Sequence, residues 1–111
     1  MDCVFCKIAS GEIPSTKVYE DDVCVAFKDL EPQAPVHVLI IPRTHIASAA
    51  DITPENSAIV AHIFEVAAKI AKEQGLEGWR IVSNVGKDGG QTVMHLHFHL
   101  LGGRSMAWPP G

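Results

Sequence analysis

Residues 94–101 read Met94-His95-Leu96-His97-Phe98-His99-Leu100-Leu101, and in the first seven of them apolar residues and histidines alternate strictly. Successive side chains of a β-strand point to opposite faces, so the pattern predicts a strand over residues 93–101 with all three histidines on one face. The opposite face, which carries Met94, Leu96, Phe98 and Leu100, is expected in the core. A solvated face more commonly carries Lys, Thr or Glu, so the histidine face indicates a chemical site.

The rest of the chain carries shorter strand patterns and one long helical pattern. Apolar and β-branched runs predict strands over residues 17–20, 23–27, 36–41 and 79–85, and Asp21-Asp22 joins the first two as a hairpin. A helical turn is expected over residues 4–8. The spacing of Ile59, Ile63, Val66 and Ile70 predicts one helical face, with Thr53 as N-cap, Pro54 at the first helical position and an end near Gly75. We therefore expect an α+β fold with a five-stranded antiparallel sheet, one long helix and a short N-terminal helix, as a single domain over residues 1–111.

Composition excludes several classes of protein. The chain has 111 residues and a net charge of −4 with no basic run, which disfavours a polynucleotide partner because such partners are held mainly through phosphate neutralisation. No apolar run approaches the roughly 20 residues that a membrane span needs. Three cysteines is an odd number, which favours reduced thiols over disulfides. We expect a cytoplasmic protein with no membrane partner.

The strand geometry limits what the three histidines can do together. Alternate residues on one face lie about 6.5–7 Å apart, so His95 and His99 would be about 13 Å apart at their roots. Two histidines could share a metal ion, whereas all three could not. One interpretation is a catalytic zinc held by His95 and His97. The other is nucleophilic catalysis, with His97 as the attacking imidazole because it is flanked on both sides.

The loop before this strand favours the second interpretation. Gly86, Gly89 and Gly90 let backbone N–H groups approach an anion closely, and Gln91 and Thr92 add side-chain donors beside the histidines. A glycine loop that leads into a histidine face is typical of a phosphate site beside a nucleophile.

The run from His95 to Leu101 resembles the signature of the histidine triad superfamily. The similarity extends over nearly the whole chain to the histidine triad nucleotide-binding (Hint) branch. It is carried by Ile13-Pro14, Glu20-Asp21-Asp22, Ala26-Phe27, Asp29, Pro32-Gln33-Ala34-Pro35-Val36-His37, Ile41-Pro42, His45, Asn84, Asp88-Gly89-Gly90-Gln91, Leu101-Gly102-Gly103-Arg104 and Trp108-Pro109-Pro110-Gly111. His at position 99, where the diadenosine-polyphosphate hydrolase and nucleotidyltransferase branches carry Gln, favours the phosphoramidase-like branch.

The resemblance implies a purine nucleoside phosphoramidase, a hydrolase that splits the P–N bond of AMP–amine conjugates. His97 would attack phosphorus and form a nucleotidyl-histidine intermediate, with no cofactor required for catalysis. By the same resemblance, His95 and His99 would bond the phosphate oxygens or orient groups around them, His37 would orient the catalytic imidazole, and Asn84 would be a further polar support. The phosphate would be held around Gly90, Gln91, Thr92 and Val93, and Thr92 would also assist the leaving amine. Thr92 departs from the usual Ser, which leaves substrate range and rate open.

The same resemblance implies a nucleoside pocket. Asp29 would bind the ribose hydroxyls, while Val4, Phe5, Ile8, Phe27 and Leu30 would line the base pocket. From the residues alone, Asp29 fits a turn equally well and the apolar residues fit plain core packing.

Cys3-x-x-Cys6 resembles a subset of bacterial members in which two cysteines bind zinc with two histidines, here His45 and His95 by position. A Cys2His2 set is a normal structural zinc site, and the alternative is a pair of packed thiols. If zinc takes His95, His97 stays free for catalysis.

Two other functions remain open: a nucleotide-binding or scaffolding module with little turnover, and the zinc-dependent hydrolase that uses His95 and His97. Family members are symmetric homodimers, so we expect a homodimer that pairs the long helix and a strand, with the tail over residues 106–111 near the neighbour's site. We expect His62 on the helix to be exposed or interfacial, and Cys24 to be in the core.

Overall fold

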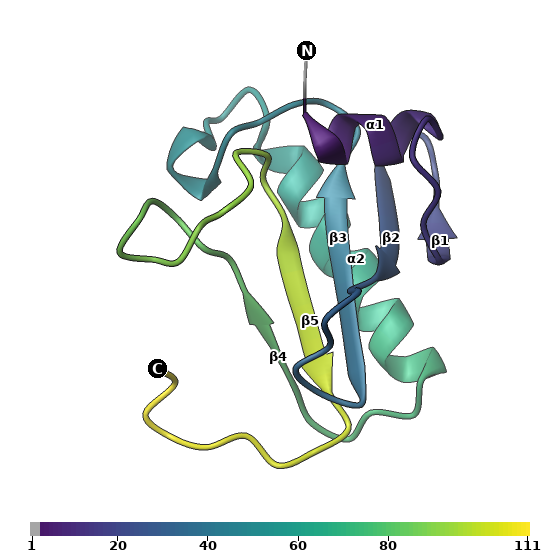
Figure 1. The fold of residues 1–111 in the computed structure, drawn as a ribbon, viewed down its shortest axis with the longest axis vertical. Helices are drawn as coiled ribbons and strands as arrows, with labels where there is room; N and C mark the ends of the chain where they lie inside the picture. Colours follow the sequence, from purple (N-terminus) through teal and green to yellow (C-terminus); the bar gives the residue numbers. More distant parts are fainter. Residues whose placement is uncertain (1–2) are drawn as a thin grey trace.

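The structure is a computed structural model that describes residues 3–111. It confirms the α+β fold: a five-stranded antiparallel sheet in the order β1-β2-β3-β5-β4, with two α-helices and a short 3-10 helix (Figure 1). The elements in chain order are α1 (Val4–Ser10), β1 (Lys17–Glu20), β2 (Cys24–Lys28), β3 (Val36–Pro42), η1 (Ala49–Asp51), α2 (Ser57–Glu73), β4 (Trp79–Val82) and β5 (Phe98–Gly102).

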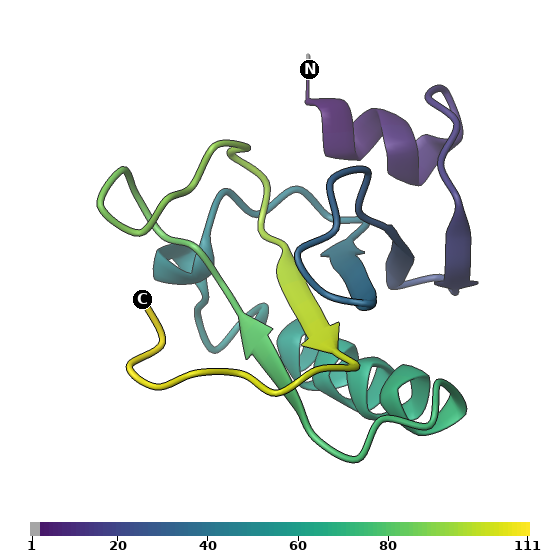
Figure 2. The ribbon, with the colours of Figure 1, turned by 60° about the horizontal axis from the view of Figure 1, so that its bottom comes forward.

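Apolar side chains cover both faces of the sheet. Helix α2 buries Ile63, Val66 and Ile70 against one face, where the strands contribute Ile40, Leu100 and their neighbours. Helix α1 lies across the other face near the N-terminal strands, and its residues pack with those of β2 and β3 (Figure 2). Strand β3 lies at the centre between β2 and β5 and is almost wholly buried. Its run of apolar residues is therefore that of a strand covered on both sides.

Helix α2 begins later than the sequence predicts. The backbone carbonyl of Thr53 accepts hydrogen bonds from the N–H groups of Asn56 and Ser57, and the Asn56 Oδ1 accepts from the Thr53 N–H at 2.7 Å. These bonds close a separate turn over residues 53–56, and the helix starts at Ser57. The expectation of Thr53 as N-cap is wrong because the Asn56 side chain satisfies the backbone of this turn instead.

The strand over residues 93–101 is also shorter than expected, and it starts at Phe98. Its partner β3 ends at Pro42, which has no N–H to extend the ladder. The N–H of Leu96 instead donates to the carbonyl of Ile46, in the segment after β3. Met94 therefore leaves the core and is 54% exposed, contrary to the expectation, whereas Leu96 and Phe98 are buried as predicted.

Strand β4 is likewise shorter than the predicted 79–85, because its pairing with β5 ends at Val82 opposite His99. The residues that follow leave the sheet and form the glycine loop. Within residues 3–111, none of the helices has the length and apolar character that a membrane crossing requires.

Candidate functional site

His97 is oriented by the backbone two residues before it. Its Nδ1 lies 2.7 Å from the carbonyl oxygen of His95, so Nδ1 carries the proton and donates it. The Nε2 atom then holds the free lone pair, and no hydrogen-bond partner for it is found among residues 3–111. His97 as a residue is 6% exposed, and its ring packs edge-on against that of Phe5, with centroids 5.2 Å apart. This arrangement fixes the tautomer that a nucleophilic imidazole needs.

His37 and His99 form a directed hydrogen-bond chain next to His97. The N–H of Gln33 donates to His37 Nδ1 at 3.0 Å, which places the proton of His37 on Nε2. His37 Nε2 then donates to His99 Nδ1 at 2.9 Å, and His99 Nε2 donates to Asn84 Oδ1 at 3.0 Å. The Asn84 amide is oriented in turn, because its Nδ2 donates to the carbonyl of Gly89 at 2.7 Å. Both histidines are neutral in this chain.

Electrostatics favour the same protonation states. Burial, followed by the nearby His97 and His37, lowers the pKa of His99 to about 4. Burial also lowers the pKa of His37, and the Asp29 carboxylate, 3.4 Å from Nε2, opposes that shift. At neutral pH these two rings act as neutral donors and acceptors.

The glycine loop is closed by Gln91. The Gly86 N–H donates to Gln91 Oε1 at 3.0 Å, and Gln91 Nε2 donates to the carbonyls of Ala47 and Val93. The Gln91 side chain thus holds the loop, and its expected role as a donor to a ligand stays a prediction. Thr92 follows it and is exposed.

All five apolar residues predicted for the base pocket line one cavity of about 400 Å³, together with Asp29. Ile13 and Leu39 also line it. Leu39 could have been predicted, since it shares a strand face with His37, two residues before it. Asp29 also makes a turn, as its Oδ1 accepts from the Glu31 N–H at 2.7 Å. The other carboxylate oxygen, Oδ2, lies 3.4 Å from His37 Nε2, and the expected contact of Asp29 with a ribose stays a prediction.

The four residues predicted as metal ligands come together from three separate segments. The ligand atoms of Cys3, Cys6, His45 and His95 all lie within 4.8 Å of one another. The measured separations are 3.2 Å from Cys3 Sγ to His95 Nδ1, 3.4 Å from Cys6 Sγ to His45 Nδ1 and 3.5 Å from Cys6 Sγ to His95 Nδ1. Tetrahedral zinc with Zn–S bonds near 2.3 Å and Zn–N bonds near 2.0–2.1 Å gives ligand separations of about 3.3–3.8 Å. The cluster therefore fits zinc in both donor type and size.

His95 is in the tautomer that metal binding requires. Its Nε2 lies 2.9 Å from the carbonyl oxygen of Pro42 and donates to it, so the lone pair of Nδ1 faces the thiols. Burial lowers the pKa of this imidazole and keeps it neutral. Both ring nitrogens are thus engaged away from His97. His95 therefore has no free ring nitrogen for a phosphate contact, and its other expected role, to orient groups around the phosphate, stays a prediction. Among the described residues, His97 belongs to none of the groups that could hold a metal ion.

A second group of polar residues was not predicted. His62 on α2 lies 2.6 Å from Asp21 Oδ2, which also accepts from the Tyr19 hydroxyl at 2.7 Å. Asp21 Oδ1 accepts from the N–H groups of Val23 and Cys24. His62 is therefore half-buried, and its hydrogen bond to Asp21 links α2 to the β1–β2 hairpin. Cys24 is fully buried as expected, and burial followed by Asp21 raises its pKa to about 12.

Comparisons with known proteins agree with this geometry. Residues 2–108 match the family model described as scavenger mRNA decapping enzyme C-term binding. An uncharacterized HIT-like protein of Synechococcus elongatus is 55% identical over 99% of this chain and 97% of its own length. A 14 kDa zinc-binding protein of Zea mays is 49% identical over 97% of this chain and 87% of its own length. The crystal structure of a HIT family hydrolase from Legionella pneumophila Philadelphia 1 superposes with a TM-score of 0.97 at 54% identity, and covers 99% of this chain and all of that one.

Proposed function

The chain belongs to the family of the scavenger decapping-enzyme C-terminal domain and, with its relatives, to the histidine triad (HIT) proteins; from this premise we propose that it is a purine nucleoside phosphoramidase. Its likeness to a solved HIT family hydrolase supports hydrolytic chemistry. The observation that carries the proposal is the anchored His97, whose Nδ1–H is held by the His95 carbonyl while Nε2 stays free.

In the first step, His97 Nε2 donates its lone pair to the α-phosphorus of a nucleoside phosphoramidate. The N–P bond forms as the P–N bond to the amine breaks, and the leaving nitrogen takes a proton from solvent on the Thr92 side and departs as the amine. The imidazole becomes positively charged, and its Nδ1–H remains bonded to the His95 carbonyl oxygen at 2.7 Å. That dipole is already oriented toward the charge that develops, so it stabilises the transition state without reorganisation.

In the second step, water attacks the same phosphorus. The bond from His97 Nε2 to phosphorus breaks, the nucleoside monophosphate leaves, and the proton released by water balances the one that the amine took up. We place His99 beside the phosphate oxygens, where its Nε2–H can donate to a phosphate oxygen in place of Asn84 Oδ1. The base would lie in the 400 Å³ cavity beside Phe5, with the ribose at Asp29.

Zinc in the Cys3, Cys6, His45 and His95 cluster would be structural. When bound, it would cross-link the N-terminal segment to the segments around residues 45 and 95. The reaction steps above need no metal, because the nucleophile belongs to a different residue. The name of the Zea mays relative, a zinc-binding protein, supports zinc binding in this chain.

The test is to trap the covalent intermediate. Protein mixed with a fluorogenic adenosine phosphoramidate is quenched in acid within milliseconds and digested, and we expect mass spectrometry to locate an adenylyl group on His97. His97→Ala should lose turnover by at least about 10⁴-fold while it still binds AMP. His62→Ala is the matched control, because it removes an imidazole outside the site. An adduct on another residue, or His97→Ala with normal turnover, refutes the proposal.

We also propose that the chain forms a homodimer. Strand β4 is an edge of the sheet, and its Trp79 is partly exposed. Phe64 on α2 is also exposed, and its ring lies 5.4 Å from that of Phe98 on β5, the strand next to β4. An edge strand and an apolar helix face are surfaces that a second copy would cover. Sedimentation equilibrium should give twice the chain mass, and Trp79→Lys should return the monomer mass.

A further inference from the structure

Gly103, the first residue after β5, lets the chain turn against the proline-rich loop around Gln33. Gly103 has a φ of +92°, in the left-handed region, and a Cβ there would lie 2.9 Å from the Cβ of Pro35. Any other residue would be strained and would push the two segments apart. The glycine thus brings the next residue, Arg104, directly to that loop.

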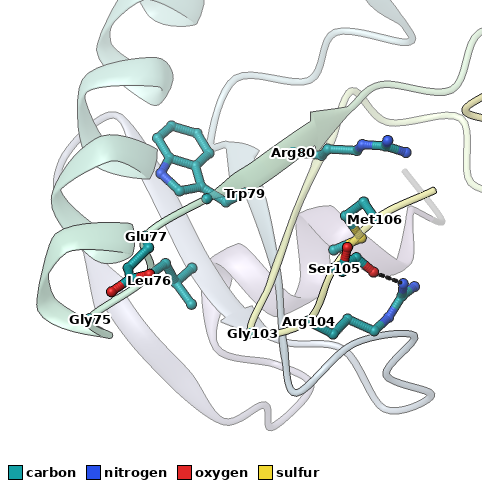
Figure 3. A pocket seen from close by; sticks show the side chains of 10 residues that line it. Gly75, Leu76, Glu77, Trp79, Arg80, Gly103, Arg104, Ser105 and Met106 are labelled. Carbon is teal, nitrogen blue, oxygen red and sulfur yellow. Dashed lines mark hydrogen bonds between the residues drawn. The ribbon is translucent and has the colours of Figure 1, made fainter. Parts of the chain in front are cut away.

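Arg104 holds the backbone carbonyl of Gln33 with two donors. Its Nε and Nη2 lie 3.2 and 3.0 Å from the Gln33 oxygen, and Nη1 donates to the Ser105 carbonyl at 3.0 Å. Figure 3 shows the last bond, beside a cavity of about 610 Å³ between the α2–β4 connection and the start of the tail. The planar fork of a guanidinium fixes both the position and the direction of the carbonyl.

The other side of Gln33 faces the histidines. Its N–H donates to His37 Nδ1, and its side-chain Nε2 donates to the Glu31 carbonyl at 3.0 Å. The residue is therefore tied at three points, and one of them sets the position of the proton on His37. The two hydrogen bonds from the Arg104 guanidinium to the Gln33 carbonyl come from outside the loop, from a residue 71 positions away in sequence.

We propose that Arg104 is a positioning residue for the reaction: by holding Gln33, it keeps the proton of His37 on Nε2 and thereby orients His99. This inference rests on the proposed function for its kinetic consequence, whereas its structural half can be tested in the ligand-free protein. Among residues 3–111, the hydrogen bonds of the Arg104 side chain go to the carbonyls of Gln33 and Ser105, so its link to the histidines runs through Gln33.

The chemistry follows from the order of donors and acceptors. If the Gln33 N–H moves away, the proton of His37 can shift to Nδ1, where it would meet solvent or a loop carbonyl. The Nε2 of His37 and the Nδ1 of His99 would then face each other with two lone pairs at 2.9 Å, which is repulsive. His99 must rotate or take up a proton, and either change misplaces the N–H that we assign to the phosphate. A misplaced N–H of His99 should lower turnover more than it weakens substrate binding.

The experiment compares Arg104→Ala and Arg104→Lys with Arg80→Ala. Arg80 is the matched control, since it is an arginine that also donates to a backbone carbonyl, that of Ala107 in the tail, but has no link to Gln33. The first readout is the tautomer of His37 and His99 from ¹⁵N chemical shifts in the ligand-free protein. We expect wild type and Arg80→Ala to show the Nε2–H form of His37, and Arg104→Ala to show a mixture with the Nδ1–H form.

The second readout is the kinetics. We expect Arg104→Ala to lower kcat about tenfold with KM changed less than twofold, and to move the acid limb of the kcat profile toward higher pH. Added methylguanidinium should restore part of the rate of Arg104→Ala. Arg104→Lys keeps the charge and one donor, so its kcat should lie between those of wild type and Arg104→Ala. Arg104→Lys also provides the test if Arg104→Ala does not fold.

The proposed function and the positioning role of Arg104 can be refuted independently of each other. If His97 forms no adduct but the Arg104 variants still shift the His37 tautomer, the proposed function is refuted and the structural half of the inference stands. If folded Arg104→Ala or Arg104→Lys keeps the wild-type ¹⁵N pattern, the inference is overturned whatever the adduct experiment gives. A lowered kcat without a tautomer change also overturns it, because that would indicate a structural role alone.

Discussion

Removal of one ligand from the cysteine–histidine cluster should destabilise the protein strongly while it leaves the reaction chemistry in place. Cys6→Ala is the sharpest change, because Cys6 Sγ lies near both His45 Nδ1 and His95 Nδ1. Bound zinc would connect residues that are up to 92 positions apart in the chain. Loss of the metal therefore frees a very long loop in the unfolded state.

The magnitude follows from that loop. The chain-entropy relation for a permanent cross-link across about 92 residues gives about 4–5 kcal/mol at 25 °C. Zinc ligands exchange, so we expect a loss of about 3–5 kcal/mol in the free energy of unfolding. For a domain of this size, about 4 °C per kcal/mol is expected, so Tm should fall by about 12–20 °C.

The assay combines elemental analysis with calorimetry. Wild type should contain one zinc per chain and lose the same 12–20 °C of Tm when a strong chelator removes it. Cys24→Ala is the control: it removes a buried cysteine outside the cluster, so it should lower Tm through a cavity but keep one zinc per chain. At 20 °C the metal-free wild type should keep more than about a tenth of its turnover, since His97 lies outside the cluster. A metal-free protein as purified, or a Tm that changes by less than about 2 °C on chelation, would refute the structural zinc; immediate loss of all turnover with the fold intact would favour a catalytic metal.

Three further changes test other parts of the structure. Asp21→Asn should reduce the free energy of unfolding by about 1–2 kcal/mol at pH 7. Burial alone would raise the pKa of Asp21, but the hydrogen bonds that its carboxylate accepts outweigh burial and hold the pKa well below its usual range. The contribution of Asp21 is therefore present above pH 4 and fades below it, so urea titrations at pH 7 and pH 3 should show a smaller difference between variant and wild type at pH 3. Burial lowers the pKa of His99 to about 4, so between about pH 6.5 and 4 the unfolded state binds more protons than the folded state. The free energy of unfolding should therefore fall as the pH falls through that window, and His99→Gln should make this fall shallower in the same urea titrations. A Cβ at Gly89 would collide with the carbonyl oxygen of Val85, so Gly89→Ala should lower kcat/KM at least about tenfold in the fluorogenic assay, whereas Gly78→Ala, which meets nothing within 4 Å, should leave it unchanged.

Local patterns predicted most of the fold because they depend on neighbouring residues only. The strand Lys17–Glu20 matches its prediction residue for residue, and Ile63, Val66 and Ile70 form the buried face of α2 as their spacing indicates. Element ends were less predictable, since they depend on contacts with distant segments. The last strand begins at Phe98 because Pro42 ends its partner, a fact about register that no local pattern contains.

In the candidate site, too, the residue types could be predicted from the sequence, whereas the contacts between distant segments could not. Residue types and the resemblance identified the histidines, the pocket residues and the cysteine–histidine cluster, and the structure brings the four cluster residues together. The pairing of His62 with Asp21 and the fork from Arg104 to Gln33 join residues 41 and 71 positions apart. Neither contact leaves a periodic signal, because each depends on how separate elements pack.

His95 and His97 of the triad hold opposite tautomers, and each tautomer is fixed by a hydrogen bond to a different backbone carbonyl. His95 donates from Nε2 to Pro42 and presents Nδ1 to the thiols, whereas His97 donates from Nδ1 and presents Nε2. The acceptor for His97 is the carbonyl of His95 itself. Because the ring of His95 is fully buried and held at both nitrogens, that carbonyl is held in place as well. A regular strand would point both rings the same way but would direct the His95 carbonyl into the ladder. The irregular backbone before Phe98 is therefore what allows a structural metal ligand to orient a nucleophile two residues later.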